Sequence, residues 1–144
     1  MIWLLRHAEA ADGSPDADRK LTKKGKRQAK NAGLALKALG VKPEACFSSP
    51  KVRSADTARL ACEPLGVDFT LEPKLAGGPF DPEALAAGLK NVLLVGHDPD
   101  FSMAVHAATG AQARMKKGGL AAIEKGELIV LLRPAELEAI AAGG

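Results

Sequence analysis

Aromatic side chains are scarce in this chain of 144 residues. One tryptophan, four phenylalanines and no tyrosine make up 3% of the sequence. Proteins that bind single-stranded nucleic acid commonly stack bases on aromatic side chains and carry a strong positive charge. The net charge of +3 and the isoelectric point near 9.0 fit an acidic ligand or partner but are modest. We therefore expect no nucleic-acid partner.

Long apolar runs and secretion signals are also missing. No apolar stretch approaches the roughly 20 residues that a membrane-spanning helix requires, and no basic segment with a cleavage site precedes the apolar residues that begin at Met1. The two cysteines, Cys46 and Cys62, lack CxxC spacing and lie in apolar segments, which is typical of buried free thiols. These features predict a soluble cytoplasmic protein without a membrane partner.

Motifs for metals and nucleotides are absent as well. The three histidines and two cysteines show no metal-ligand spacing, and neither GxGxxG nor GxxxxGK[ST] occurs. We expect no metal ion and no cofactor.

Strand signals alternate with helix signals along the chain. Residues 1–5 and 92–95 are apolar throughout, which is typical of strands buried on both faces. We expect strands over residues 1–5, 45–47, 68–71 and 92–95, and a hairpin formed by residues 120–123 and 128–132.

Caps and glycines predict five helices, four between these strands and one after the hairpin. The first helix follows a Thr22 cap and ends at Gly40. Its predicted inner face consists of Ala29, Ala32, Leu36 and Leu39. The second has Ser49-Pro50 as cap and first helical position and spans residues 52–65. The others begin at Asp81-Pro82 and reach about residue 89, begin at Asp98-Pro99 and stop at Gly110, and begin at Arg133-Pro134 before a frayed Gly143-Gly144 tail.

Helical crossovers between short buried strands imply parallel pairing. We therefore predict one α/β domain over residues 1–144. It is a three-layer sandwich with a mostly parallel central sheet, flanked by helices and extended by a C-terminal antiparallel hairpin.

Three predicted strand ends carry polar residues that suit an anion site. Arg6-His7, residues 48–53 and Gly96-His97 each follow a strand, and ligands of such sheets bind beyond the carboxyl ends of strands. Arg53 lies in the first turn of a helix, where free N–H groups and a guanidinium both favour phosphate. His7 could attack phosphorus through a ring nitrogen, while His97 could stabilise the transferring oxygens.

Four separated motifs resemble the histidine phosphatase superfamily, and most closely its small SixA-type phosphohistidine phosphatase branch. The motifs are Leu5-Arg6-His7-Ala8-Glu9-Ala10; Leu21-Thr22-Lys23-Lys24-Gly25 with Gln28-Ala29; Ser48-Ser49-Pro50 with Arg53 and Thr57-Ala58; and Val95-Gly96-His97-Asp98-Pro99. The resemblance implies a phosphoglycerate mutase-like fold, a pocket formed by Arg6, His7, Arg53 and His97, and phosphoryl transfer to His7.

One departure from that family concerns the proton donor. Relatives that act on small phosphate esters commonly carry a glutamate just after the segment that is Leu75-Ala76-Gly77-Gly78 here, and no acid stands there. An alkoxide leaving group needs protonation, which contributes roughly 10²–10⁴ in rate, whereas protonated phosphohistidine expels neutral imidazole. Asp81, Glu9 and Asp98 remain candidate donors, although Asp98 fits a helix cap better.

Lysines and arginines cluster between residues 20 and 30. A solvated helix face explains such a cluster most simply, but Lys23, Lys24 and Arg27 could also dock an acidic phosphoprotein. Lys116-Lys117 is a weaker candidate for the pocket rim.

Three functions are compatible with these residues. We expect a metal-independent phosphohydrolase that acts through phospho-His7 on phosphohistidine in a protein. The first alternative is a phosphatase for a small phosphate ester, with Asp81 or Glu9 as the proton donor. The second is a non-catalytic module that binds phosphorylated proteins.

Overall fold

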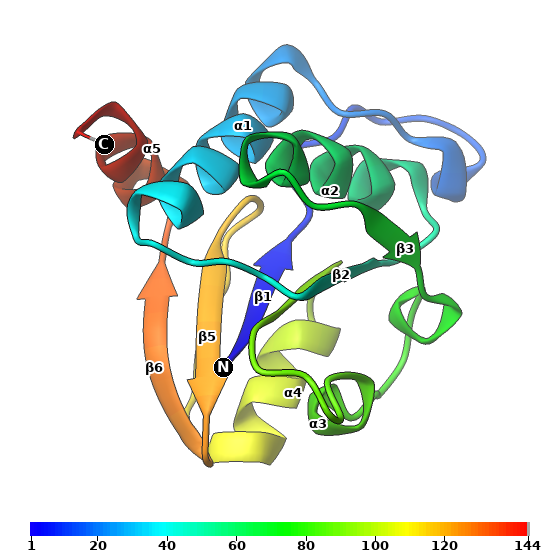
Figure 1. Ribbon diagram of the computed structural model, residues 1–144. Helices are drawn as coiled ribbons and strands as arrows, with labels where there is room; N and C mark the ends of the chain where they lie inside the picture. Colours follow the sequence, from blue (N-terminus) through cyan, green and yellow to red (C-terminus); the bar gives the residue numbers. More distant parts are fainter. Residues whose placement is uncertain (144) are drawn as a thin grey trace.

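The computed structural model, described for residues 1–143, is built on a six-stranded sheet in the order β3-β2-β4-β1-β5-β6 (Figure 1). The strands are β1 (Ile2–Arg6), β2 (Ala45–Ser48), β3 (Phe69–Leu71), β4 (Val92–Gly96), β5 (Leu120–Glu124) and β6 (Glu127–Leu132). The four strands from β3 to β1 are parallel, and β5 runs antiparallel to both β1 and β6.

Helices cover both faces of this sheet (Figure 1). One layer contains α1 (Lys23–Ala38), α2 (Val52–Leu65) and α5 (Pro134–Gly143), and the other contains α3 (Pro82–Leu85) and α4 (Asp100–Thr109). Two short 3₁₀ helices, η1 (Asp16–Asp18) and η2 (Pro73–Leu75), interrupt the loops. The predicted three-layer α/β fold with a C-terminal antiparallel hairpin is confirmed.

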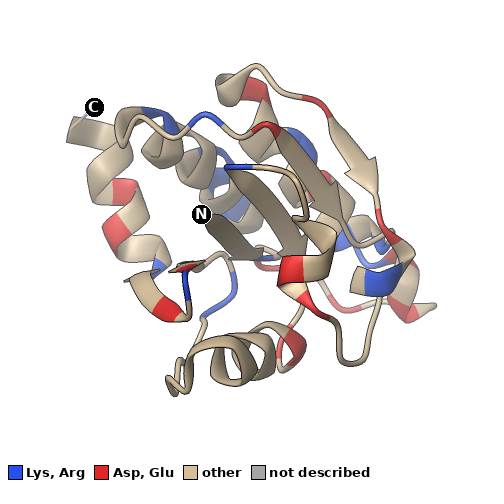
Figure 2. Ribbon diagram, turned by 60° about the horizontal axis from the view of Figure 1, so that its bottom comes forward, with Lys and Arg blue, Asp and Glu red and all other residues tan. Residues whose placement is uncertain are grey.

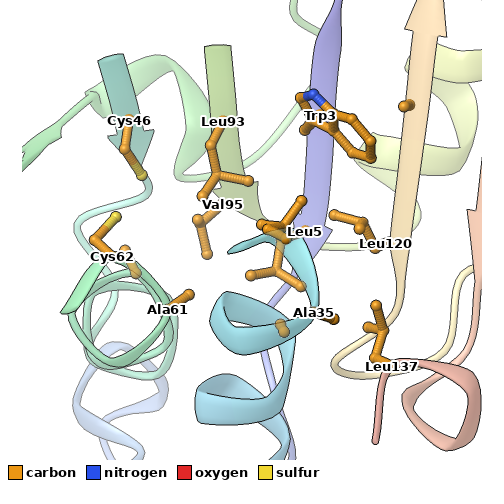
Figure 3. Packing of buried hydrophobic residues seen from close by; sticks show 14 residues of the cluster. Trp3, Leu5, Ala35, Cys46, Ala61, Cys62, Leu93, Val95, Leu120 and Leu137 are labelled. Carbon is orange, nitrogen blue, oxygen red and sulfur yellow. The ribbon is translucent and has the colours of Figure 1, made fainter. Parts of the chain in front are cut away.

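Alternate side chains of β1 supply two separate cores. Ile2 and Leu4 pack in the cluster under α4, whereas Trp3 and Leu5 pack in the cluster under α1, α2 and α5 (Figure 3). Leu4 and Leu5 are fully buried, and each such side chain contributes about 1.5–3 kcal/mol relative to an exposed one. The central strands carry no charged residues along most of their length (Figure 2).

Both cysteines are free and buried, as expected, between β2 and α2. The sulfurs of Cys46 and Cys62 point toward each other (Figure 3). Hydrogen bonding to Cys62, together with burial, raises the pKa of the Cys46 thiol, so this side chain stays neutral and packs as a small apolar group.

Several predicted helix boundaries are wrong by a few residues. Leu39 was expected on the inner face of α1 but caps the helix and is 48% exposed. The cap of α2 is Lys51 rather than Ser49, because the Ser49 hydroxyl accepts the Lys51 N–H within the turn that precedes the helix.

The remaining differences lie at α3 and at the C-terminus. Helix α3 ends at Leu85, well before residue 89. Its N-cap is Asp81, whose carboxylate accepts the Glu83 N–H. Helix α5 includes Gly143, whereas Gly144 lies outside the described residues. The hairpin turn consists of Lys125 and Gly126, both with positive φ, a geometry that matches the twist of the two strands.

The sheet order brings the carboxyl ends of β2, β4 and β1 next to one another. Strand β4 lies between β2 and β1, with Ser48 paired to Val95 and Arg6 paired to Gly96. The polar residues after these strands therefore meet at one edge of the sheet. Within residues 1–143, no helix combines the length and the apolar character needed to cross a bilayer.

Gly33 permits the close approach of α1 and α2. A Cβ at this position would lie 2.2 Å from the Ala61 carbonyl oxygen, and backbone cannot move aside as a flexible side chain can. We expect Gly33→Ala to lower the free energy of unfolding by about 1–3 kcal/mol, because overpacking outweighs the ~1 kcal/mol gain in helix propensity. Urea denaturation measures the change. Gly13→Ala, whose Cβ would meet only Arg19 Cγ at 3.6 Å, is the control; equal stability of the two variants would contradict this packing account.

Candidate active site

A pocket of about 280 Å³ opens at the carboxyl ends of β1 and β4 and at the start of α2. All four side chains predicted to form a phosphate pocket line it: Arg6, His7, Arg53 and His97. The remaining lining residues are Arg19, Lys51, Ala76, Gly77, Asp98, Asp100 and Lys117. Five arginine and lysine side chains therefore surround two histidines and two aspartates.

The backbone at the end of β1 is held from both sides. The His7 N–H donates to the Gly96 carbonyl at 2.8 Å, and the Gly118 N–H donates to the carbonyls of both Arg6 and His7. The next residue, Ala8, donates its N–H to Thr57 Oγ1 on α2. These bonds fix the chain where it leaves the sheet, so that the side chains of two consecutive residues line one cavity.

His7 presents a free ring nitrogen to this cavity. Its Nδ1 lies 2.8 Å from the Ala8 carbonyl oxygen, which assigns the proton to Nδ1 and leaves the Nε2 lone pair unprotonated. Burial, with smaller contributions from the charges of Arg53, Arg6 and Lys117, lowers the pKa of His7 to about 4. The imidazole is therefore neutral at pH 7, as a nucleophile must be.

His97 is oriented by two serine hydroxyls. Its Nε2 lies 2.8 Å from Ser49 Oγ and 3.3 Å from Ser54 Oγ, and the ring centroids of His97 and His7 are 5.2 Å apart. Burial and the neighbouring His7 and Arg53 lower the pKa of His97 to about 3. If a serine hydroxyl donates to Nε2, the His97 proton lies on Nδ1.

Three buried nitrogens of the pocket residues have no hydrogen-bond partner among residues 1–143. They are Arg6 Nε, Arg53 Nε and His97 Nδ1. Buried N–H groups without acceptors are costly, by about 1–3 kcal/mol each. Arg6 and Arg53 line the same pocket as the two histidines, and their guanidinium groups supply positive charge that favours an oxyanion there.

Both arginines are held in place by the loops around the pocket. Arg6 Nη1 donates to the Met115 carbonyl at 2.7 Å. Arg53 donates from Nη1 to the Asp16 carbonyl and from Nη2 to Asp16 Oδ2. The hydrogen bond from Arg19, followed by the charge of Arg53, lowers the pKa of Asp16, so its carboxylate stays ionised.

Sequence reasoning missed several of these supporting residues. Asp16 and Ser54 act through side-chain contacts between separate segments, and their sequence neighbours gave no signal for those contacts. Ser49 and Thr57 belonged to a quoted motif, but Ser49 was interpreted only as a helix cap and Thr57 was given no role.

The candidate proton donors lie in different places. Asp81 caps α3 and does not line the pocket, and Glu9 pairs with Lys24 at 3.7 Å and lines a second cavity. Asp98 does line the pocket, but its carboxylate accepts from the Ser102 N–H and hydroxyl in the first turn of α4. The N-cap residue of α4 is Pro99, so the predicted Asp98 cap lies one residue before the observed one.

The segment that lacks an acid forms part of the pocket wall. Ala76 and Gly77 line the pocket together with His7 and His97. Asp100, in the first turn of α4, is a lining carboxylate that the sequence interpretation did not single out. The Asp-Pro-Asp pattern at residues 98–100 could have identified it.

A second cavity of about 650 Å³ adjoins the pocket, since Arg6 and Lys117 line both. Lys24 and Arg27 of the predicted docking cluster line this cavity, whereas Lys23 lines neither one. Lys117 lies at the pocket, as suggested for the Lys116-Lys117 pair. The residues described by the structure contain no group of three His, Cys, Asp or Glu side chains arranged to hold a metal ion.

Comparison with known proteins identifies the family. The model of the histidine phosphatase superfamily (branch 1) matches residues 2–78, more than half of the chain. An uncharacterised protein of Picosynechococcus sp. is 33% identical over 140 residues, which cover 87% of this chain and 85% of that protein. The mitochondrial serine/threonine-protein phosphatase Pgam5 of Drosophila persimilis is 33% identical over 87 residues, covering 57% of this chain but only 30% of Pgam5.

Solved structures share the fold over nearly the whole chain. The protein histidine phosphatase SixA, solved with tungstate, superposes with a TM-score of 0.84 at 22% identity, covering 94% of this chain and 98% of SixA. A SixA-assigned protein from Agrobacterium tumefaciens gives a TM-score of 0.78 at 26% identity, covering 92% of this chain and 97% of that protein. The chain therefore belongs to the histidine phosphatase superfamily, as its four motifs predicted, and is a phosphatase with the SixA-type fold.

Proposed function

We propose that this phosphatase hydrolyses phosphohistidine in a protein through a covalent intermediate on His7, without a metal ion. One observation carries the proposal: a neutral His7, whose Nδ1 faces the Ala8 carbonyl and whose Nε2 is therefore free, lines one pocket together with the guanidinium groups of Arg6 and Arg53. The pocket thus offers a nucleophile and an oxyanion site side by side.

The reaction proceeds in two steps, phosphoryl transfer to His7 and hydrolysis of phospho-His7. His7 Nε2 attacks phosphorus, and the electron pair of the substrate P–N bond leaves with the substrate imidazole, whose other ring nitrogen already carries a proton. Water then attacks phosphorus, the bond to Nε2 breaks, and the water proton passes to the phosphate or to solvent. Arg6, Arg53 and His97 stabilise the equatorial oxygens in both steps.

The pocket wall favours a substrate with a good leaving group. Ala76 and Gly77 cannot donate a proton, and the Asp98 carboxylate already accepts two hydrogen bonds from Ser102. A protonated phosphohistidine needs no enzymatic acid, whereas an alkoxide does. Hydrolysis of a small phosphate ester is a second candidate function, because Asp100 lines the same pocket and its carboxyl group could protonate an alkoxide leaving group.

The relatives support a protein substrate. SixA is named as a protein histidine phosphatase, and Pgam5 as a serine/threonine-protein phosphatase. Docking by Lys24 and Arg27 forms part of this proposal. Cytoplasmic location remains a prediction from the sequence.

We expect His7→Ala to reduce phosphate release from a phosphohistidine peptide by about 10⁴-fold or more, because the covalent route is lost. The assay includes a metal chelator and is repeated with an aryl phosphate. His106→Ala is the matched control, since His106 is exposed on α4 and lies outside the pocket lining. Full activity of His7→Ala would falsify the nucleophile assignment. If the native protein binds the phosphopeptide but releases no phosphate from either substrate, the non-catalytic binding module replaces the phosphatase proposal.

We expect the phosphatase to lose activity only at an unusually low pH. Since the pKa of His7 is lowered to about 4, protonation removes the nucleophile only as pH falls through that value. We expect the acid limb of kcat/KM, corrected for substrate ionisation, to have its midpoint near this pKa.

Folding stability must be followed in parallel by circular dichroism. His7 and His97 bind protons more readily in the unfolded chain, so stability also declines as pH falls from about 6.5 towards the lowered folded pKa values. A midpoint near 6.5 in a still-folded protein would show that His7 does not titrate as proposed.

Restoring an acid at the pocket wall should broaden the substrate range. Ala76→Glu places a carboxyl group in the lining, and protonation of the leaving group is worth roughly 10²–10⁴ in rate when geometry is ideal. We expect at least a tenfold rise in kcat/KM for an alkyl phosphate relative to a phosphohistidine peptide, with Ala76→Gln as the isosteric control. The same change in both variants would show that a missing acid does not limit ester hydrolysis.

A further inference from the structure

The second cavity has the size and charge of a ligand site in its own right. Its volume of about 650 Å³ is more than twice that of the phosphate pocket, at about 280 Å³. The lining contains five cations and two carboxylates: Arg6, Lys24, Arg27, Lys116 and Lys117 against Glu9 and Glu138. We call this cavity the basic groove.

The basic groove is continuous with the phosphate pocket. Arg6 and Lys117 line both cavities, and Arg6 is anchored between them by its bond to the Met115 carbonyl. A peptide that extends from a phosphoryl group in the pocket can therefore reach the groove.

Most of the groove's positive charge is not neutralised within the protein. Among residues 1–143, the only groove cation in an ion pair is Lys24, which lies 3.7 Å from Glu9 with its own side chain 65% exposed. Helix α1 has no acidic residue in its first turn, so the partial positive charge of the helix N-terminus adds to that of the lysines instead of being offset. An anionic ligand would be favoured by all of these charges together.

The lining suits a peptide better than a nucleic acid. Among the described residues, none that lines the groove is aromatic, so bases would find no stacking surface. The Gln28 amide oxygen already accepts the Glu9 N–H, but its NH₂ group and the Asn31 amide can bond a peptide backbone, and Pro134 and Ala135 offer an apolar wall.

We propose that the basic groove binds an acidic peptide segment next to the phosphorylated residue of the substrate protein. This inference rests on the proposed phosphohistidine phosphatase function and specifies its substrate class. It also narrows the predicted docking cluster, because Lys24 and Arg27 line the groove whereas Lys23 does not.

Binding without turnover tests the groove directly. Two unphosphorylated peptides are compared by fluorescence anisotropy, identical except that one carries glutamates where the other carries glutamines. We expect the native protein to bind the glutamate peptide about tenfold more tightly at low salt, with the preference declining as salt rises. Equal affinity for the two peptides would overturn the proposal.

Matched double variants separate the groove from net charge. Lys24→Glu with Arg27→Glu should abolish the preference for the glutamate peptide. Lys26→Glu with Lys30→Glu changes the net charge equally on the same helix but outside the groove lining, and should retain it. If both double variants lose the preference equally, the preference comes from the net charge of the protein and not from the groove. Displacement of the glutamate peptide by an oligodeoxythymidylate of equal charge at the same concentration would overturn the peptide assignment in favour of nucleic acid.

Turnover distinguishes this proposal from the function on which it rests. For phosphohistidine peptides with glutamate or glutamine flanks, the native enzyme should favour the glutamate peptide about tenfold in kcat/KM, mainly through KM. Hydrolysis of both at equal rates, with equal binding, would refute the groove and leave the phosphatase intact. Selective binding of the acidic peptide without any hydrolysis would refute the phosphatase and support the groove.

Discussion

Parallel pairing of β1 with β4 is the constraint on which the candidate active site depends. It sets Arg6 opposite Gly96, and the His7 N–H then continues the ladder to the Gly96 carbonyl beyond the last strand residue. Gly96 cannot carry a side chain, because a Cβ would lie 2.8 Å from the Phe101 ring. Two histidines separated by ninety residues in sequence therefore lie with their rings 5.2 Å apart.

The candidate site keeps both histidines neutral although arginine and lysine side chains line the same pocket. Burial is the larger cause of their lowered pKa values, and the surrounding arginines and lysines act in the same direction. A neutral imidazole retains its lone pair for attack, while the guanidinium groups supply positive charge that does not titrate. In the proposed mechanism, different residues therefore supply the nucleophile and the electrostatic stabilisation.

Contacts from loops hold the pocket residues in place after the strands have brought them together. Asp16 holds Arg53 from the long loop after β1, and Gly118 bonds to the carbonyls of Arg6 and His7 from the loop before β5. Neither contact could be predicted from the sequence, because both join segments that are far apart in the chain and have no regular periodicity. The errors at Leu39 and at the start of α2 have a related cause: local propensity alone does not decide where a helix ends.

The sequence by itself determined the α/β class, the alternation of buried strands with helices, and four of the residues that line the pocket. Apolar runs of this length can be buried only between two helical layers, and polar residues after parallel strands must then share one edge of the sheet. Only the tertiary structure decided the free nitrogen of His7, the neutrality of both histidines, and the separation of Lys24 and Arg27 from Lys23. Tautomer, pKa and cavity lining depend on distances between side chains from different elements, which no local pattern in the sequence specifies.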